Sequence, residues 1–103
     1  MATYQVHFQA NPAQWPTDPQ QFLAVWEQTA QAVDALIETG AMQAPNYITP
    51  SEGYVRLDAD SKSAAIALVA PFFPMWSTEI DELVPWEQAK EAILGAARQA
   101  ASA

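Results

Sequence analysis

Three side chains whose chemistry suits proton transfer or carboxylate binding fall in predicted strands: His7, Arg56 and Glu82. Imidazole titrates near neutral pH, so His7, the one histidine of the chain, has the chemistry of a general acid or base. A guanidinium binds a carboxylate through two parallel hydrogen bonds, which suits Arg56 to holding an acidic or carbonyl group. Glu82 has the chemistry of a base if its carboxylate is shielded from water.

Each of these residues also has a structural interpretation, and the sequence leaves both open. His7 suits a hydrogen-bonded place in an interface as well as a catalytic one. For Arg56 the alternative is a salt bridge to a carboxylate of the last strand, which carries Glu79, Asp81 and Glu82. The same salt bridge would explain Glu82 equally well.

Aromatic side chains form the second set of candidates. Tyr47, Tyr54 and Trp76 are suited to line a flat pocket for an aromatic or polyene ligand. Trp15 and Trp26 are suited to close that pocket from a loop and from the first helix. Packing in the core or in a dimer interface is favoured for Tyr47, Tyr54 and Trp76 when each is taken singly. Packing in the core is also favoured for Trp26.

Several kinds of site are excluded by what the sequence lacks. The chain has no cysteine, which excludes disulfides, thiolate chemistry and zinc–thiolate sites. A single histidine among scattered carboxylates is a poor metal-binding pattern, and three isolated glycines cannot form a phosphate-binding loop. We therefore expect neither a metal nor a cofactor.

Composition and charge restrict the fold and the partners. A chain of 103 residues predicts one domain spanning residues 1–103, and half of its residues are hydrophobic, which is typical of a folded protein. Twelve acidic against four basic residues give a net charge of −8, which argues against nucleic acid and anionic membrane surfaces as partners. No signal-peptide pattern and no apolar run of ~20 residues occurs, so a cytoplasmic protein is expected.

Hydrophobic periodicity predicts the first half of the fold. Thr3 to Ala10 alternates between an apolar and an uncharged polar face, as a half-buried strand does, with His7 on the polar face. Asp18 is a suitable N-cap for a helix over Pro19 to Thr39, and Gly40 is suited to end it. Ala41 to Thr49 and Gly53 to Asp58 are expected to pair as a hairpin, and the proline within the first of them, Pro45, indicates an edge strand or a bulge.

The second half of the chain is predicted to form a short helix, a last strand and a further helix. Asp60 or Ser61 caps a short helix that Pro71 ends, with a buried face formed by Ala65, Ile66, Leu68, Val69 and Phe72. Trp76 to Val84 is the last strand, where a bulge near Asp81 would explain imperfect alternation. A further helix follows Pro85, with an inner stripe of Trp86, Ala89, Ile93 and Ala97 and an outer pair of Glu87 with Lys90.

The element order predicts an α+β fold of the ferredoxin-like βαββαβ type with an extra C-terminal helix. Two helices then cover one face of a four-stranded antiparallel sheet and leave the other face bare. A bare face that holds Tyr and Trp side chains is expected to be covered by a second copy of the chain, which predicts a homodimer or a higher homo-oligomer.

Several motifs in this order resemble the muconolactone isomerase family, within the dimeric α+β barrel superfamily. The matching segments are Val6 to Asn11, Leu57-Asp58-Ala59-Asp60-Ser61, Phe73-Pro74 and Glu82-Leu83-Val84-Pro85. The resemblance implies two sheets closing face to face into a barrel, and cofactor-free proton transfer in a small lactone. The chain departs from the family pattern at Met75 to Thr78 and in the helix after Pro85.

Two hypotheses of function follow, and a third shares the fold. The first is a cofactor-independent isomerase or cyclase acting on a small hydrophobic or aromatic carbonyl or lactone compound, with His7 as acid or base and Arg56 or Tyr54 orienting an oxygen. The second is a non-catalytic ligand-binding or assembly module, and the third is a cofactor-free monooxygenase. A closed cavity at His7 would favour the enzyme, whereas an interior filled by Tyr and Trp would favour the module.

Overall fold

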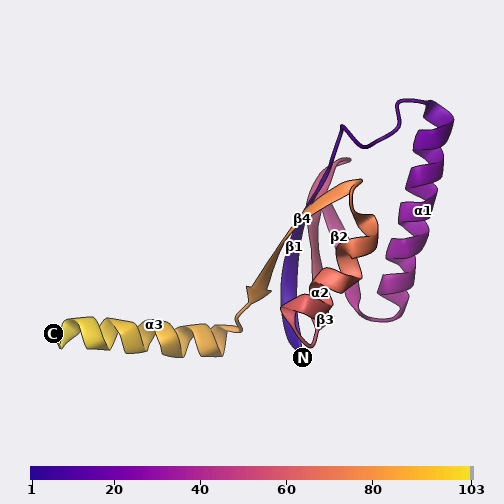
Figure 1. The fold of residues 1–103 in the computed structure, drawn as a ribbon. Helices are drawn as coiled ribbons and strands as arrows, with labels where there is room; N and C mark the ends of the chain where they lie inside the picture. The colour runs from indigo at the N-terminus through magenta and orange to yellow at the C-terminus, as the bar shows by residue number, and fades with distance from the viewer. Residues whose placement is uncertain (103) are drawn as a thin grey trace.

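The computed structural model describes residues 1–102, apart from the side chain of Ala44. Four strands and two helices form the body of the molecule, and a third helix follows it (Figure 1). In chain order the elements are β1 (Ala2–Ala10), α1 (Pro19–Glu38), β2 (Met42–Thr49), β3 (Glu52–Ala59), α2 (Lys62–Val69), a 3-10 turn (Ala70–Phe72), β4 (Trp76–Leu83) and α3 (Trp86–Ala101).

The strands form one antiparallel sheet in the order β2-β3-β1-β4, and Figure 1 shows α1 and α2 on the same side of it. This confirms the predicted α+β, ferredoxin-like arrangement with its extra C-terminal helix. The central strands β1 and β3 are each paired on both edges, so they are the most constrained part of the sheet.

Side-chain caps fix the helix boundaries as predicted. The Asp18 carboxylate accepts a hydrogen bond from the backbone N–H of Gln21 at 3.0 Å, and Gly40 ends α1 with a φ of 81°, where a side chain would be strained. Ser61, not Asp60, caps α2: its hydroxyl accepts from the Ala64 N–H at 3.1 Å. The α-helix α2 ends before Pro71, as expected. Pro71 itself belongs to the short 3-10 turn that follows the helix.

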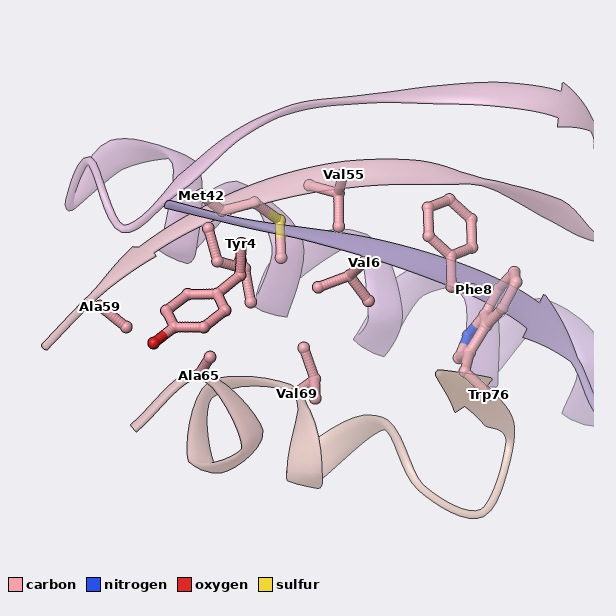
Figure 2. Packing of buried hydrophobic residues seen from close by; sticks show 10 residues of the cluster. Tyr4, Val6, Phe8, Met42, Val55, Ala59, Ala65, Val69 and Trp76 are labelled. Carbon is pink, nitrogen blue, oxygen red and sulfur yellow. The ribbon is translucent and has the colours of Figure 1, made fainter. Parts of the chain in front are cut away.

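The core lies between the sheet and the two helices that cover it, α1 and α2 (Figure 2). Tyr4, Val6 and Phe8 of β1 are buried on the helix side of the sheet, as the alternation predicts. The prediction was wrong for Ile66, which is 49% exposed. Since α2 is only eight residues long, Ala65 and Val69, one turn apart, form its buried side, and Ile66 lies about 100° around the helix from Ala65.

Strand β2 shows the two features that its proline predicts. It lies at an edge of the sheet, and its register with β3 shifts between Gln43 and Asn46, on either side of Pro45. A proline cannot donate to the sheet, so an irregular edge strand is where it costs least.

The bulge predicted in β4 is absent. β4 pairs with β1 without interruption from Trp76 to Leu83, and the two faces of the strand alternate strictly. Glu79 and Asp81 lie on the open face, whereas Glu82 lies on the helix face near the exposed end of the strand. The acids are accommodated without a bulge because an edge strand keeps their side chains in contact with water: all three are exposed.

Helix α3 does not pack against the body, which corrects the prediction of an inner stripe. Figure 1 shows it extending away from the sheet, and the molecule measures 64 × 28 × 21 Å. Trp86 and Ile93 of the predicted stripe are 66% and 60% exposed. The predicted pair on its outer side is present, with Lys90 Nζ 3.0 Å from a carboxylate oxygen of Glu87. None of the helices within residues 1–102 is long and apolar enough to cross a membrane.

Candidate functional site

The candidate residues divide between the two faces of the sheet. His7, Tyr54 and Arg56 lie together on the open face, because His7 pairs with Tyr54 in the β1–β3 register and Arg56 is two residues further along β3. The helix side holds the other five, which are Glu82, Tyr47, Trp76, Trp15 and Trp26. The expectation of one flat pocket lined by Tyr47, Tyr54 and Trp76 was therefore wrong, and Trp76 does not belong to the bare face.

On the open face, His7 forms a close pair with Glu52. Its Nε2 lies 2.7 Å from a carboxylate oxygen of Glu52, and Gln9 donates to the same oxygen at 3.2 Å. The Tyr54 ring stacks on the imidazole with 4.8 Å between ring centroids. With Nε2 engaged by the carboxylate, Nδ1 remains as the nitrogen that can accept or donate a proton. The His7 side chain is 22% exposed, so it faces an open surface and not a closed cavity.

Arg56 does not form the predicted salt bridge with β4. Its register partners are Gln5 of β1 and Gln43 of β2, so the acids of β4 lie two strands away. Within residues 1–102, the ion pairs are His7 with Glu52 and Lys90 with Glu87. Arg56 instead lines an open polar hollow together with Gln5, Gln43 and Tyr54.

Glu82 is separated from His7 and Arg56 by the sheet itself. It pairs with Tyr4 across the β1–β4 ladder, and paired residues share a face. Burial of the Tyr4 ring, and secondarily the negative charge of Glu82, raise the pKa of the Tyr4 hydroxyl. Glu82 therefore cannot act together with His7 on one substrate within a protomer.

The helix side contains an apolar hollow, walled by the sheet, α1 and the end of α2. It encloses about 450 Å³ of space with its open mouth included. Val6 and Phe8 of β1, Val55 of β3 and Trp76 of β4 line its floor, and Val33 of α1 covers it. Concave surfaces with mostly apolar walls and a few polar groups are typical of sites for small organic ligands.

Aromatic rings surround one end of the hollow. Trp76 meets Phe8, Trp15 and Trp26 edge to face, with ring centroids 5.4, 5.5 and 5.5 Å apart. The Trp15 indole N–H donates to the Met75 carbonyl at 2.8 Å, which fixes this ring in place. Trp15 and Trp26 therefore pack behind Trp76 and support it, consistent with their core interpretation.

The Trp76 indole nitrogen has no partner. Trp76 is 4% exposed, and its Nε1 is buried without a hydrogen bond to any described residue. Figure 2 shows the nitrogen on the edge of the ring turned toward Val6 and Val69, which also line the hollow. An indole N–H can only donate, and a buried donor left without an acceptor costs about 1–3 kcal/mol. A ligand with an acceptor oxygen in the hollow would remove that cost.

Tyr47 lines the mouth of the same hollow. Its ring contacts Phe8 edge to face at 4.9 Å and remains 45% exposed. Partial burial raises the pKa of the Tyr47 hydroxyl, so the group stays protonated at neutral pH and keeps a proton to donate.

The fold has a solved counterpart. No protein-family model matches the chain, and no curated protein matches it by sequence. The fold is similar to that of muconolactone isomerase. One solved structure of that enzyme aligns with a TM-score of 0.64 and 20% identity, over 81% of this chain and 88% of the other. The likeness supports the resemblance noted in the sequence at the level of the fold, and it establishes a muconolactone isomerase-like arrangement of the sheet and helices.

Sequence reasoning missed two residues that bear on the candidate site. Glu52 falls between the two strands predicted for the hairpin, although its position two residues before Tyr54 puts it on the same face as His7 once the hairpin register is known. Thr29 of α1 lines the hollow, and a threonine within an amphipathic helix gives no sign of such a position in the sequence. Among residues 1–102, no three His, Asp or Glu side chains gather in a way that could hold a metal ion.

Proposed function

We propose that this protein binds a small apolar compound carrying a carbonyl or lactone oxygen in the hollow between the sheet and the helices. The observation that supports the proposal is the buried indole N–H of Trp76 at the aromatic end of the hollow. Among the described residues, it is the one buried side-chain polar atom that has no hydrogen-bond partner. The edge of the ring that carries this N–H faces the hollow, so the N–H would donate to the ligand oxygen.

The walls restrict the ligand further. Val6, Val55 and Val33 present only apolar surface, so most of the ligand must be hydrocarbon. The cavity volume of the hollow, without its open mouth, is only about 50 Å³, so a ligand is small or displaces the Tyr47 ring at the mouth. Tyr47 stands at that mouth with a protonated hydroxyl, which is suited to a second acceptor on the ligand.

The likeness to muconolactone isomerase supports a lactone as the first compound to test. That enzyme's name describes an isomerase of a lactone, and a lactone ring combines apolar carbons with acceptor oxygens. The fold likeness alone does not carry a substrate from one protein to the other at 20% identity. The agreement between the acceptor that Trp76 needs and the oxygen of a lactone is the chemical reason for the choice.

Nuclear magnetic resonance of the four indole N–H groups tests the proposal directly. ¹⁵N-labelled protein is titrated with a small five-membered lactone and, separately, with cyclopentene, which has a similar ring without oxygen. The Trp76 resonance, assigned by its loss in Trp76→Phe, is expected to move downfield with the lactone and much less with cyclopentene. A lactone that leaves the Trp76 resonance unmoved at saturating concentration would contradict the proposal.

Proton transfer at His7 is the second candidate function, and the His7–Glu52 pair favours it. A carboxylate 2.7 Å from one imidazole nitrogen orients the ring and leaves the other nitrogen to exchange a proton, which is the arrangement of an acid–base group. Arg56, two residues along β3 from Tyr54, would hold an acidic group of a substrate lying on the open face.

A second copy of the chain is the proposed cover of that open face. His7 and Tyr54 are partly exposed in the single chain, and catalysis by an imidazole benefits from the exclusion of water. Two sheets meeting face to face would enclose His7 in a chamber shared by both copies. The polar lining, with Gln5, Gln9 and Gln43 along the strands, suits a hydrated chamber and not a dry interface.

A further inference from the structure

Helix α3 is an arm without a docking surface on its own chain. Within residues 1–102, no hydrogen bond, ion pair or aromatic contact joins α3 to the sheet, to α1 or to α2. The radius of gyration is 17.8 Å, against about 13 Å for a compact domain of this length. The difference reflects an arm that leaves the body, as Figure 1 shows.

The connection between β4 and α3 keeps the arm away from the body. It consists of Val84 and Pro85 alone, and Pro85 has an extended conformation with φ −57° and ψ 147°. A residue before proline disfavours the helical region, so Val84 is held extended as well. These two extended residues lead the chain away from the sheet before α3 begins, as Figure 1 shows.

An arm of this composition needs a partner to remain helical and soluble. A helix of 16 residues is marginal in water on its own, and Gly95 in its interior lowers the helix propensity by about 1 kcal/mol relative to alanine. One side of α3 carries an apolar stripe at spacings of three and four residues, formed by Trp86, Ala89, Ile93, Ala97 and Ala100. We define these five residues as the arm stripe, and its largest members, Trp86 and Ile93, are more than half exposed.

The open face of the sheet is a poor surface for the arm stripe. That face carries the carboxylates of Glu52, Asp58, Glu79 and Asp81, which an apolar helix would remove from water without compensation. The body of the chain carries the whole net charge of −8, since the two acids and two bases of α3 cancel. The arm stripe therefore needs an apolar, uncharged surface, and a second arm stripe is such a surface.

We propose that α3 pairs antiparallel with α3 of a second copy of this chain, through the arm stripe. When the two-fold axis passes beside Ile93, Trp86 of one helix faces Ala100 of the other, and Ala89 faces Ala97. The largest side chain of the stripe thus meets a methyl group at each end, and the two Ile93 side chains meet at the centre. A surface that complements itself in this way is what a two-fold interface requires.

Charge complementarity selects the antiparallel direction. Glu87 in the first turn and Arg98 in the last turn lie on the same flank of the arm stripe. Matching flanks face each other in an antiparallel pair, so Glu87 of each copy approaches Arg98 of the other. In a parallel pair the charged flank would instead face the opposite flank, which carries Ala92 and Ala96 and offers no counter-charge.

Engineered cysteines test the pairing without interference, because the chain has no cysteine of its own. Under mild oxidation Ile93→Cys is expected to form a disulfide-linked dimer, since residues at the two-fold axis approach within the ~7 Å that a disulfide spans. Gln88→Cys, on the opposite side of the helix, and Ala100→Cys, whose two copies would be ~20 Å apart along the axis, are expected to remain unlinked. Linking through Ala100→Cys would overturn the antiparallel direction.

Sedimentation of the full chain at about 10 μM provides the second measurement. Ile93→Glu places a charge at the centre of the stripe and is expected to lower the assembly by one step, from dimer to monomer or from a larger oligomer to its half. Gln88→Glu adds the same charge on the far side and should keep the wild-type mass. An unchanged mass in Ile93→Glu would overturn the proposal. So would dissociation of Ile93→Glu combined with no linking of Ile93→Cys, because the arm would then dock on the body of the second copy.

Discussion

Nε2 of His7 lies 2.7 Å from a carboxylate oxygen of Glu52, and this pair occupies the open face of the sheet. The neighbouring residue on β1, Phe8, points to the other face and forms the floor of the apolar hollow. The chain thus keeps its acid–base pair and its apolar ligand space on opposite sides of one strand. A ligand in the hollow of a protomer cannot reach His7 of that same protomer, so binding and proton transfer are separately testable.

Proton transfer at His7 predicts exchange of a carbon-bound proton. In D₂O the wild-type protein is expected to speed exchange of the acidic proton next to the carbonyl of an unsaturated five-membered lactone, followed by proton NMR. His7→Gln removes the exchanging nitrogen and should lower the protein-dependent rate by ~10²-fold. Glu52→Gln keeps the shape of the partner but removes its charge, and a loss of about 10-fold is expected.

Matched variants separate this role from a structural one. Gln5→Ala changes a neutral side chain on the same strand face and is expected to leave the exchange rate within about twofold of wild type. Equal rates in wild type and His7→Gln, with both proteins folded, would exclude His7 as the proton-transfer group.

Two glycines predict opposite effects of the same substitution. A Cβ on Gly53 would lie 2.8 Å from the Phe8 ring and 2.9 Å from the Tyr47 Cα, and it would collide with the Asn46 carbonyl oxygen. Gly53→Ala is therefore expected to lower the free energy of unfolding by about 3 kcal/mol. A Cβ on Gly95 of α3 meets nothing within 4 Å, so Gly95→Ala should stabilise the helix by roughly 1 kcal/mol. Urea unfolding for Gly53→Ala and helical circular dichroism for Gly95→Ala measure the two effects, and effects of the same sign would contradict the packing described.

The raised pKa of Tyr4 predicts loss of stability in alkali. Burial and then Glu82 raise the pKa of this hydroxyl in the folded state above its ordinary value of 10.0. The unfolded chain therefore releases this proton first, and stability falls as the pH rises from about 10 toward the folded pKa. Tyr4→Phe has no proton to lose and should show a shallower decline between pH 9 and 11 in urea midpoints. An identical slope in both proteins would show that Tyr4 does not carry this effect.

The sequence predicted those elements whose signals are local. Asp18 and Gly40 lie at the two ends of α1, as their capping chemistry indicates. Pro45 marks an edge strand because proline lacks the backbone N–H that an inner strand of any sheet needs. The alternation of β1 places Tyr4 and His7 on opposite faces without knowledge of their neighbours. These features depend on a few adjacent residues, and the structure keeps them.

The errors occurred where partners distant in the sequence decide the outcome. Arg56 lies two strands from β4 because β1 inserts between β3 and β4, and the chain order does not reveal this distance. Tyr47 and Tyr54 fall on opposite faces because the register of β2 shifts around Pro45. Trp86 and Ile93 have a periodicity that predicts burial, but periodicity alone does not specify whether the covering surface belongs to the same chain.

A comparison of ligand affinities in wild type and Trp76→Phe tests the account of the hollow most directly. Calorimetry would measure a five-membered lactone and cyclopentene against both proteins, with Trp86→Phe on α3 as a control for the loss of an indole. The quantity compared is the ratio of the affinity for the lactone to the affinity for cyclopentene. If the Trp76 N–H donates one hydrogen bond to the lactone, this ratio is expected to be about 10-fold higher in the wild type and in Trp86→Phe than in Trp76→Phe, or roughly 1.4 kcal/mol. An equal preference for the lactone in all three proteins would contradict the account.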